Sequence, residues 1–179
     1  MRIQDDSDMK IVGEYVEPED AADELTRLLK EQQENGNLDR ARALGEALVE
    51  AAREAASEHP SENETLLLQR WLLLLFTTDI EVQRLLPNGL VARTAFGRFY
   101  DVLQQTEPAI YEQLQQNGSL SFYYLCQEDG AILKTKAAET FASLCGRGDD
   151  KTTIALGKTL IEQCKVKVDA LADAQEFVQ

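Results

Sequence analysis

The stretch Ser61–Phe76, with the sequence SENETLLLQRWLLLLF, joins a helix-start signal to an almost unbroken apolar run. Ser61 and Glu64 have the spacing of a capping box, in which each side chain accepts a hydrogen bond from the other residue's backbone N–H. Apolar residues then cover nearly every side of the helix, and such a helix must be surrounded by other elements. We therefore predict a buried central helix over residues 62–77, with the remaining helices arranged about it.

The rest of the chain repeats helical signals. Apolar residues recur every three or four positions, and Gly or Pro residues separate the segments. Asn35–Gly36 joins the first two segments so tightly that we expect an antiparallel helical hairpin. Residues 119–129 suit either a helix or a strand, and we predict a helix because no other segment offers a strand partner. The predicted helices cover residues 18–34, 38–58, 62–77, 78–86, 90–105, 108–116, 119–129 and 131–145. A final long helix follows, with Asp149 or Asp150 as its cap.

These segments predict an all-α fold, either a multi-helix bundle or a short array of antiparallel helical hairpins around the central helix. The chain has 179 residues and 44% hydrophobic content, which is enough for one core without disulfides or metal. We expect a polar, acidic N-terminal tail over residues 1–16 and a single all-helical domain over residues 17–179.

The composition indicates a cytoplasmic protein. The central apolar run is shorter than the roughly 20 residues that span a bilayer, so we expect no membrane segment. Residues 1–8 are polar and acidic, unlike a secretory signal. Cys126, Cys145 and Cys164 are evenly spaced and include no Cys-x-x-Cys pair, which fits free thiols in a reducing compartment.

The net charge of −14 is concentrated toward the N-terminus, where residues 1–65 hold 18 of the 32 acidic and 7 of the 18 basic residues. Proteins that bind nucleic acids or anionic membranes use clustered Lys and Arg, so we expect neither partner. The acidic surface permits a basic protein partner, or mimicry of a nucleic acid by carboxylates at phosphate-like spacing. A solvated face that keeps the chain soluble is the simpler interpretation.

Few residues point to catalysis. The one histidine, His59, precedes a proline at a helix end, which suits a structural role and leaves no zinc site with several histidines. Gly157–Lys158–Thr159 matches the end of a phosphate-binding loop, but it falls inside a helical heptad with no preceding strand. No Glu-x-x-His motif accompanies the helix-borne acids. We therefore predict no metal site, no cofactor and no catalytic set, and we favour a non-enzymatic role.

One arginine and two aromatic groups stand out as candidate functional residues. Arg70 lies between Leu66 and Leu74 on the central helix, so we expect it to be at least partly buried. A buried arginine needs a carboxylate or carbonyls, or else it marks an anion site, and we favour the structural ion pair. The aromatic groups have a composition found both in cores and in protein-binding surfaces. The candidate partner or ligand surface comprises Arg70, Arg93, Phe96, Arg98, Phe99, Tyr100, Phe122, Tyr123 and Tyr124.

The first two predicted helices carry a pattern of leucines, a glycine turn and small residues, formed by Leu25, Leu28, Leu29, Gly36, Ala41 and Leu48. This pattern resembles a tetratricopeptide-type helical hairpin over about residues 21–53. The large aromatic of that family's second helix is replaced here by small residues around Gly45, and no second copy occurs at the family's spacing. The resemblance implies a concave surface that binds peptides or partner proteins.

Two classes of function remain. We favour a non-enzymatic protein–protein interaction module, such as an adaptor, a regulator or a chaperone-like protein, with self-association as an alternative. The second class is a small-ligand or anion-binding protein, or an enzyme, that uses an arginine and carboxylate pocket. The ligand class predicts a concave pocket with an arginine that lacks an internal partner, whereas the module predicts an exposed apolar groove rimmed by charge.

Overall fold

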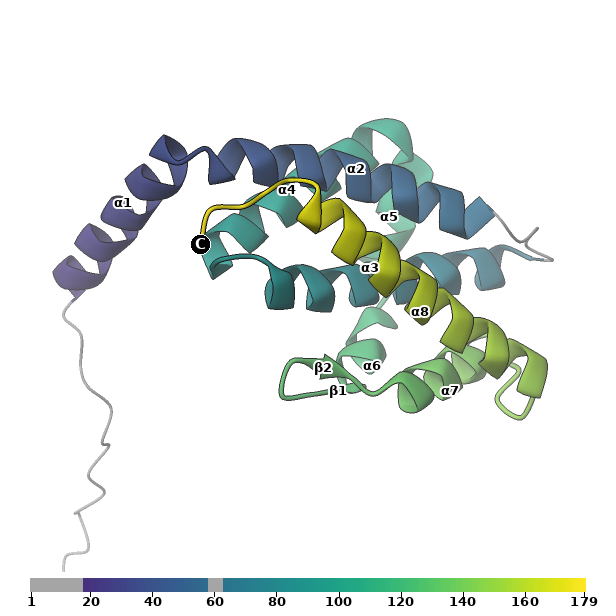
Figure 1. The fold of residues 1–179 in the computed structure, drawn as a ribbon. Helices are drawn as coiled ribbons and strands as arrows, with labels where there is room; N and C mark the ends of the chain where they lie inside the picture. Colours follow the sequence, from purple (N-terminus) through teal and green to yellow (C-terminus); the bar gives the residue numbers. More distant parts are fainter. Residues whose placement is uncertain (1–17, 58–62) are drawn as a thin grey trace, which may run out of the picture.

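The computed structural model describes residues 18–57 and 63–179, and it confirms the all-α fold for them (Figure 1). The tail predicted over residues 1–16 and the helix end predicted at His59–Pro60 lie outside the described residues. The elements are α1 (Pro18–Glu34), α2 (Asn37–Ser57), α3 (Glu64–Leu85), α4 (Gly89–Thr106), α5 (Pro108–Gln116), α6 (Leu120–Tyr124), β1 (Gln127–Glu128), β2 (Ala131–Ile132), α7 (Lys134–Leu144) and α8 (Lys151–Asp173).

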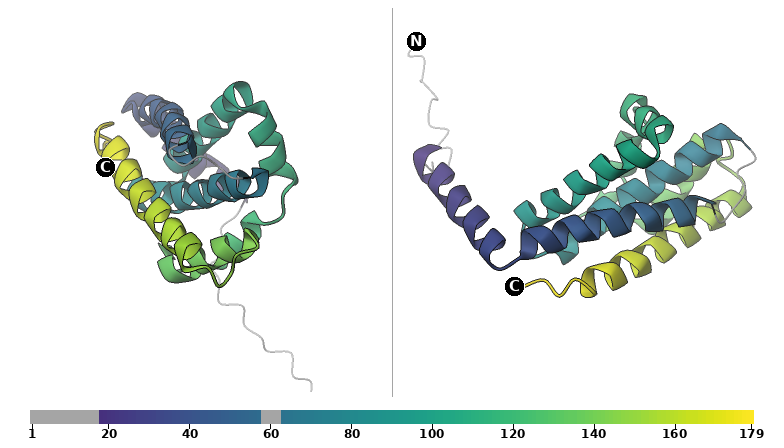
Figure 2. Two further views of the ribbon diagram at one scale, coloured as in Figure 1. Left: turned by 90° about the vertical axis from the view of Figure 1, so that its right-hand side faces the viewer. Right: turned by 90° about the horizontal axis from the view of Figure 1, so that it is seen from above.

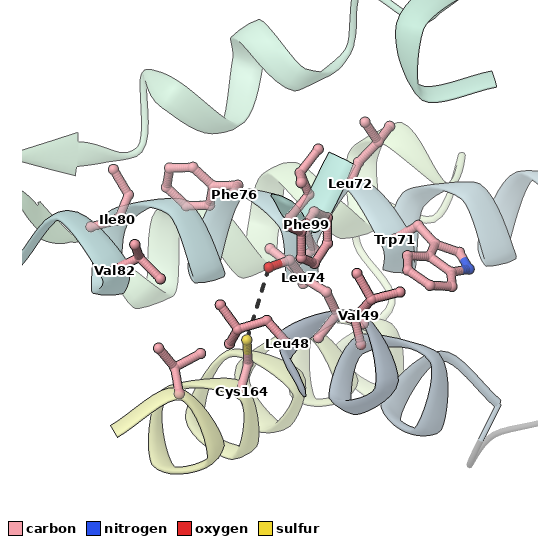
Figure 3. Close-up of a cluster of buried hydrophobic side chains, with 14 of the residues drawn as sticks. Leu48, Val49, Trp71, Leu72, Leu74, Phe76, Ile80, Val82, Phe99 and Cys164 are labelled. Carbon is pink, nitrogen blue, oxygen red and sulfur yellow. Dashed lines mark hydrogen bonds between the residues drawn. The ribbon is translucent and has the colours of Figure 1, made fainter. Parts of the chain in front are cut away.

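The central helix α3 contacts α2, α4, α5, α6, α7 and α8. Residues 71–78 are all buried, and Figure 3 shows Leu74 and Phe76 on opposite sides of the helix. Neighbouring elements therefore cover α3 on every side, as its sequence predicts.

The start of α3 differs from the prediction. The N-cap is Asn63, whose side-chain oxygen accepts a hydrogen bond from the Leu66 N–H at 2.8 Å. Glu64 is consequently the first helical residue, so it does not occupy the third position that a capping box requires. Ser61, the predicted cap, lies outside the described residues. Asn is as good a cap as Ser, so residue type alone does not distinguish a start at Asn63 from one at Ser61.

The end of α3 also differs, because residues 78–85 continue the same helix rather than starting a new one. The Thr77 hydroxyl donates to the Leu73 carbonyl at 2.8 Å, a bond within one helix that lets threonine sit in its interior. Glu81 is buried with a side-chain exposure of 1%, and its two oxygens lie 2.7 Å from Arg84 and 2.8 Å from Lys165 of α8. Glu81 thus takes part in an ion-pair network between α3 and α8.

The contact between α2 and α4 depends on Gly45. A Cβ atom at this position would lie only 2.4 Å from the carbonyl oxygen of Ala95 and 3.0 Å from the backbone nitrogen of Phe99. The absence of a side chain therefore allows the two helix backbones to approach closely. On both helices the residues beside this contact, Leu44 and Ala95, are fully buried.

The last helix follows its sequence pattern closely. Of the two predicted caps, Asp150 is the one that caps α8, by accepting hydrogen bonds from the N–H groups of Thr152 and Thr153. Gly157 is an interior residue of α8 that lies against Ala138 and Phe141 of α7. The segment that resembles a phosphate-binding loop is therefore continuous helix, with its N–H groups used by the helix itself.

The helix predicted over residues 119–129 is wrong for most of its length. Only α6 is helical, and Gln127–Glu128 pairs in antiparallel fashion with Ala131–Ile132. The turn between them is Asp129–Gly130, and both residues have positive φ angles of 49° and 74°. An Asp-Gly pair suits the central positions of such a hairpin turn. The strand partner is the next segment, Ala131–Ile132, which the sequence predicts as the start of the following helix.

The predicted antiparallel packing of the first two helices is not formed. Gly36 ends α1 with a φ angle of 79°, as the sequence indicates, but α1 does not turn back along α2. Instead α1 extends away from the rest of the helices, and its contacts with α2 are few (Figures 1 and 2). The remaining helices pack around α3 without it.

Candidate functional site

An exposed apolar surface of the described chain lies on α1. Leu25 is 56% exposed and Leu29 is 44% exposed, and Ala22 on the same face is exposed as well. At 100° per residue these positions and Leu28, which is half-buried, fall within one stripe of the helix. We refer to Ala22, Leu25, Leu28 and Leu29 as the α1 stripe. Its sequence spacing is that of a helix face that packs against another element.

A set of polar contacts holds α1 in its projecting direction. Asn37, which is fully buried, donates from its side chain to Gln32 of α1 at 2.7 Å and to the backbone carbonyl of Val178 at 2.8 Å. Its side-chain oxygen accepts from the Val178 N–H at 2.9 Å. Arg40 donates to the Asn35 carbonyl at 2.7 Å. The joint between α1 and α2 is therefore a bonded structure that includes the C-terminal segment.

The charge on α1 is strongly acidic. Its acidic residues are Glu19, Asp20, Asp23, Glu24, Glu31 and Glu34, and its basic residues are Arg27 and Lys30. Glu24 and Glu31 fall beside one edge of the α1 stripe on the helical wheel. A surface that covers the stripe would consequently meet carboxylates along this edge.

A second candidate site is a hollow between α3 and α4, which we call the Arg93 hollow. It has a volume of about 350 Å³ and brings together three of the predicted residues, Arg93, Phe96 and Tyr100. Asp79 and Gln83 of α3 form its other side, and Gly89, Ala92 and Gly97 of α4 complete the lining. Nothing lies within 4 Å of a Cβ placed at Gly97, so this part of the α4 surface is open.

The polar groups of the Arg93 hollow are unequally satisfied. Asp79 accepts a hydrogen bond from Gln83 at 2.8 Å and another from the hydroxyl of Tyr124, a further predicted residue. Burial and this bond to Asp79 raise the pKa of Tyr124, and burial raises the pKa of Tyr100. Both hydroxyls therefore stay protonated at neutral pH. Within the described residues Arg93 is exposed and forms no ion pair, so it is the charged group available to a ligand.

The remaining aromatic candidates do not belong to one surface. Phe99 is 1% exposed and stacks on Phe96 from inside the core, with ring centroids 5.5 Å apart. Tyr123 is fully buried and donates to the side-chain oxygen of Gln69 at 2.9 Å. Phe122 is 53% exposed on α6, but it does not line the hollow. Tyr123 and Phe99 thus have structural roles.

The other two arginines are engaged within the chain. Arg98 donates from Nε to Glu46 at 2.8 Å and links α4 to α2. Arg70 is 2% exposed, in agreement with the predicted burial, and its charge interacts with the Cys145 thiol. Burial nevertheless outweighs the arginines near that thiol and raises the pKa of Cys145 to about 11. Neither Arg70 nor Arg98 is brought into contact with Arg93.

Sequence reasoning missed Asp79 and Gln83. These residues face α4 only because α3 continues past residue 77, and the predicted break at Thr78 removed them from the central helix. The described residues contain no group of three or more His, Cys, Asp or Glu side chains placed to hold a metal ion. Nor is any helix in this part of the chain both long and apolar enough to cross a membrane.

Comparison with protein-family models, curated proteins and solved structures found no match to this chain. The resemblance of residues 21–53 to a tetratricopeptide-type hairpin stays a prediction. The function is therefore argued from the α1 stripe and the Arg93 hollow.

Proposed function

We propose that this chain is a non-enzymatic protein-interaction module that docks through α1. The observation that carries the proposal is the exposure of Leu25 and Leu29 on a helix that extends away from its own bundle. Complete burial of a leucine side chain contributes about 1.5–3 kcal/mol, so even the two exposed leucines represent a substantial unused binding energy. An amphipathic helix laid in a groove with anchors three, four and seven residues apart is a common mode of peptide recognition.

The polar joint at Asn37 supports the same proposal. Gln32, Asn37 and Val178 are joined by three hydrogen bonds with lengths of 2.7–2.9 Å. A helix held in its bound direction loses less conformational entropy on docking than a free segment does. The bundle therefore acts as the support, and α1 as the part that a partner contacts.

The acidity of α1 indicates the chemistry of the partner. Glu24 and Glu31 lie beside one edge of the stripe, and the whole chain carries a net charge of −14. A groove edged by Lys or Arg therefore fits better than a second copy. We further propose a cytoplasmic location. The three cysteines are free thiols, and a reducing compartment would keep them in that state.

The test compares two double variants on opposite faces of α1. Leu25→Ser with Leu29→Ser removes the apolar anchors, and Asp23→Ser with Arg27→Ser is the matched control with the same net charge as the wild type. Affinity capture from the source cells is followed by reconstitution with the purified captured protein. We expect a stoichiometric partner that binds the wild type and the control and binds the stripe variant at least tenfold more weakly. Equal binding by all three proteins would exclude α1 as the docking element.

A second candidate function rests on the Arg93 hollow. Arg93 is an exposed cation without an ion pair among the described residues, beside the rings of Phe96 and Tyr100. A planar ligand with a carboxylate or phosphate would place its ring on the aromatic side chains and its charge at Arg93. Calorimetric titration with benzoate and with inorganic phosphate tests this candidate. Binding that disappears in Arg93→Met and persists in Arg42→Met would support it, and absence of binding would reject it.

A further inference from the structure

The space between α2 and α8 contains a cleft that neither the α1 stripe nor the Arg93 hollow includes. It has a volume of about 180 Å³. Its α2 side is formed by Leu48 and a series of alanines, Ala51, Ala52 and Ala55. Since alanine side chains end at Cβ, the two helices can lie beside each other without filling the space between them.

The floor of the cleft is supplied by α3 and α8. Leu74 and Thr78 reach it from the central helix, and Cys164 and Val168 reach it from α8. Figure 3 shows Leu48, Leu74 and Cys164 converging from the three helices, and Cys164 donates to the Leu74 carbonyl at 3.9 Å. The apolar side chains that line the cleft lack protein contacts on the side that faces it. A molecule that filled the cleft would supply those contacts.

The polar atoms of the floor are already paired with each other. The hydroxyl of Thr78 and the sulfur of Cys164 lie 3.4 Å apart. Burial also raises the pKa of the Cys164 thiol to about 11, so the thiol is neutral at pH 7. The deep part of the cleft therefore offers apolar contact and presents no charge to an occupant.

The mouth of the cleft is polar. Lys167 of α8 and Glu54 of α2 face each other across it with 3.7 Å between Nζ and Oε2, and Gln163 lies beside them. Both charged side chains are more than half exposed, so their ion pair is weak and water competes with it. Parting of these two side chains would open a path for a small molecule from solvent.

We propose that the cleft between α2 and α8 binds a small uncharged apolar molecule with the size of a single aromatic ring. An apolar cavity of about 150 Å³ in another protein is enough to hold benzene, and the present volume is slightly larger. The lining selects against charge, because an ionised group below the mouth would lose its water without gaining a partner. This site lies apart from the α1 stripe, and its occupation does not require a protein partner.

The test uses toluene as the probe and the full chain as the protein. Backbone amide signals are followed by ¹⁵N-correlated NMR during a titration up to the aqueous solubility of toluene. We expect saturable shifts confined to residues 48–55, 74–78 and 163–168, the segments that line the cleft. Absence of saturable shifts, or shifts centred on another part of the molecule, would overturn the proposal.

A matched pair of variants ties the signal to the cleft. Ala55→Leu fills the space from α2 and is expected to weaken toluene binding at least tenfold. Ala43→Leu is the same change on the same helix at an exposed position outside the cleft, and it is expected to leave binding unchanged. Ala51→Leu replaces Ala55→Leu if the latter does not fold, as judged by circular dichroism. Undiminished binding in the filled variant would overturn the proposal.

A charged analogue tests the ligand class. Benzoate has the same ring as toluene with a carboxylate in place of the methyl group. We expect no shifts from benzoate at residues 163–168 under conditions in which toluene saturates the site. Tighter binding of benzoate there would show that Lys167 selects an anion, and the uncharged class would then be wrong.

Discussion

The helices α1 and α2 follow each other in the chain and have similar patterns, yet they have opposite environments. Leu44 and Leu48 of α2 are 0% and 1% exposed, whereas Leu25 and Leu29 of α1 are 56% and 44% exposed. Helical periodicity predicts which face of a helix needs to be covered. It does not say whether the cover comes from the same chain. The contrast therefore separates the stabilising part of this molecule from the part available to a partner.

The two helices should differ most in how much stability the protein loses when a leucine is replaced by alanine. Leu44→Ala leaves a cavity in a fully buried site and should lower the free energy of unfolding by about 3 kcal/mol. Leu29→Ala removes a side chain that has little contact and should change it by no more than about 0.5 kcal/mol. Urea titrations monitored by circular dichroism measure both values. Similar losses for the two variants would mean that α1 packs on the bundle in solution.

The next effect concerns the glycine that lets α2 approach α4. Gly45→Ala places a methyl group against the Ala95 carbonyl, so the helices must separate, and we expect a loss of about 2 kcal/mol. Gly97→Ala is the matched control, since it lies on α4 with nothing within 4 Å of the added carbon. The free energy of unfolding of the control should rise by up to about 1 kcal/mol, because alanine is a better helix former than glycine. A neutral result for Gly45→Ala in the same urea titration would contradict the close contact.

The sequence was sufficient for the parts of the fold that depend on local signals. The apolar run before Phe76 predicted a covered helix, and the pair Asp149–Asp150 predicted the start of α8 to within one residue, because both signals act locally. The antiparallel hairpin at Asn35–Gly36 was wrong for a non-local reason. The direction of α1 depends on Asn37 and Val178, which lie 141 positions apart in the chain.

The candidate site was predictable only in part, for a related reason. Arg93, Phe96 and Tyr100 follow from one helix pattern and do lie together. Asp79 joins them because two elements meet in space, and no spacing within either element indicates this. The ion pair between buried Glu81 and partly exposed Lys165 had no sequence signal either, since both residues also suit an exposed helix face.

The free energy of unfolding should depend on pH through groups buried in the packed helices and not through α1. Burial raises the pKa of Cys164 from 9.0 to about 11 in the folded chain, so between these values only the unfolded chain ionises this thiol. The stability contributed by the neutral thiol is complete below pH 9 and is lost as the pH rises toward 11. We expect Cys164 to account for about 2 kcal/mol of this loss, at about 1.4 kcal/mol per pKa unit with allowance for relaxation.

The contribution of Cys164 can be isolated from that of other groups. Cys145 also has a pKa raised to about 11, and the buried tyrosines add to the decline above pH 10. The urea midpoints of the wild type and of Cys164→Ala are therefore compared at pH 8 and pH 10.5. The variant should lose less stability between the two pH values than the wild type does. Equal losses would indicate that the Cys164 thiol ionises in the folded protein as readily as in the unfolded one.

Asn37→Ala is expected to lower stability less than the substitutions at Leu44 and Gly45, and it bears most directly on α1. The change removes both side-chain contacts to Val178 and leaves the buried amide of Gln32 without its bond, at a cost of about 1–2 kcal/mol. Without these contacts α1 should lose its fixed direction, so its amides should exchange with deuterium faster while those of α2 from Ala41 onward do not. Asn117→Ala, which removes an asparagine bond to the Ser119 N–H far from α1, is the control and should leave exchange in α1 unchanged. If the amides of α1 exchanged at the wild-type rate in Asn37→Ala, the polar joint would not fix the direction of α1. The difference in leucine exposure between α1 and α2 would then have to arise within α1 itself.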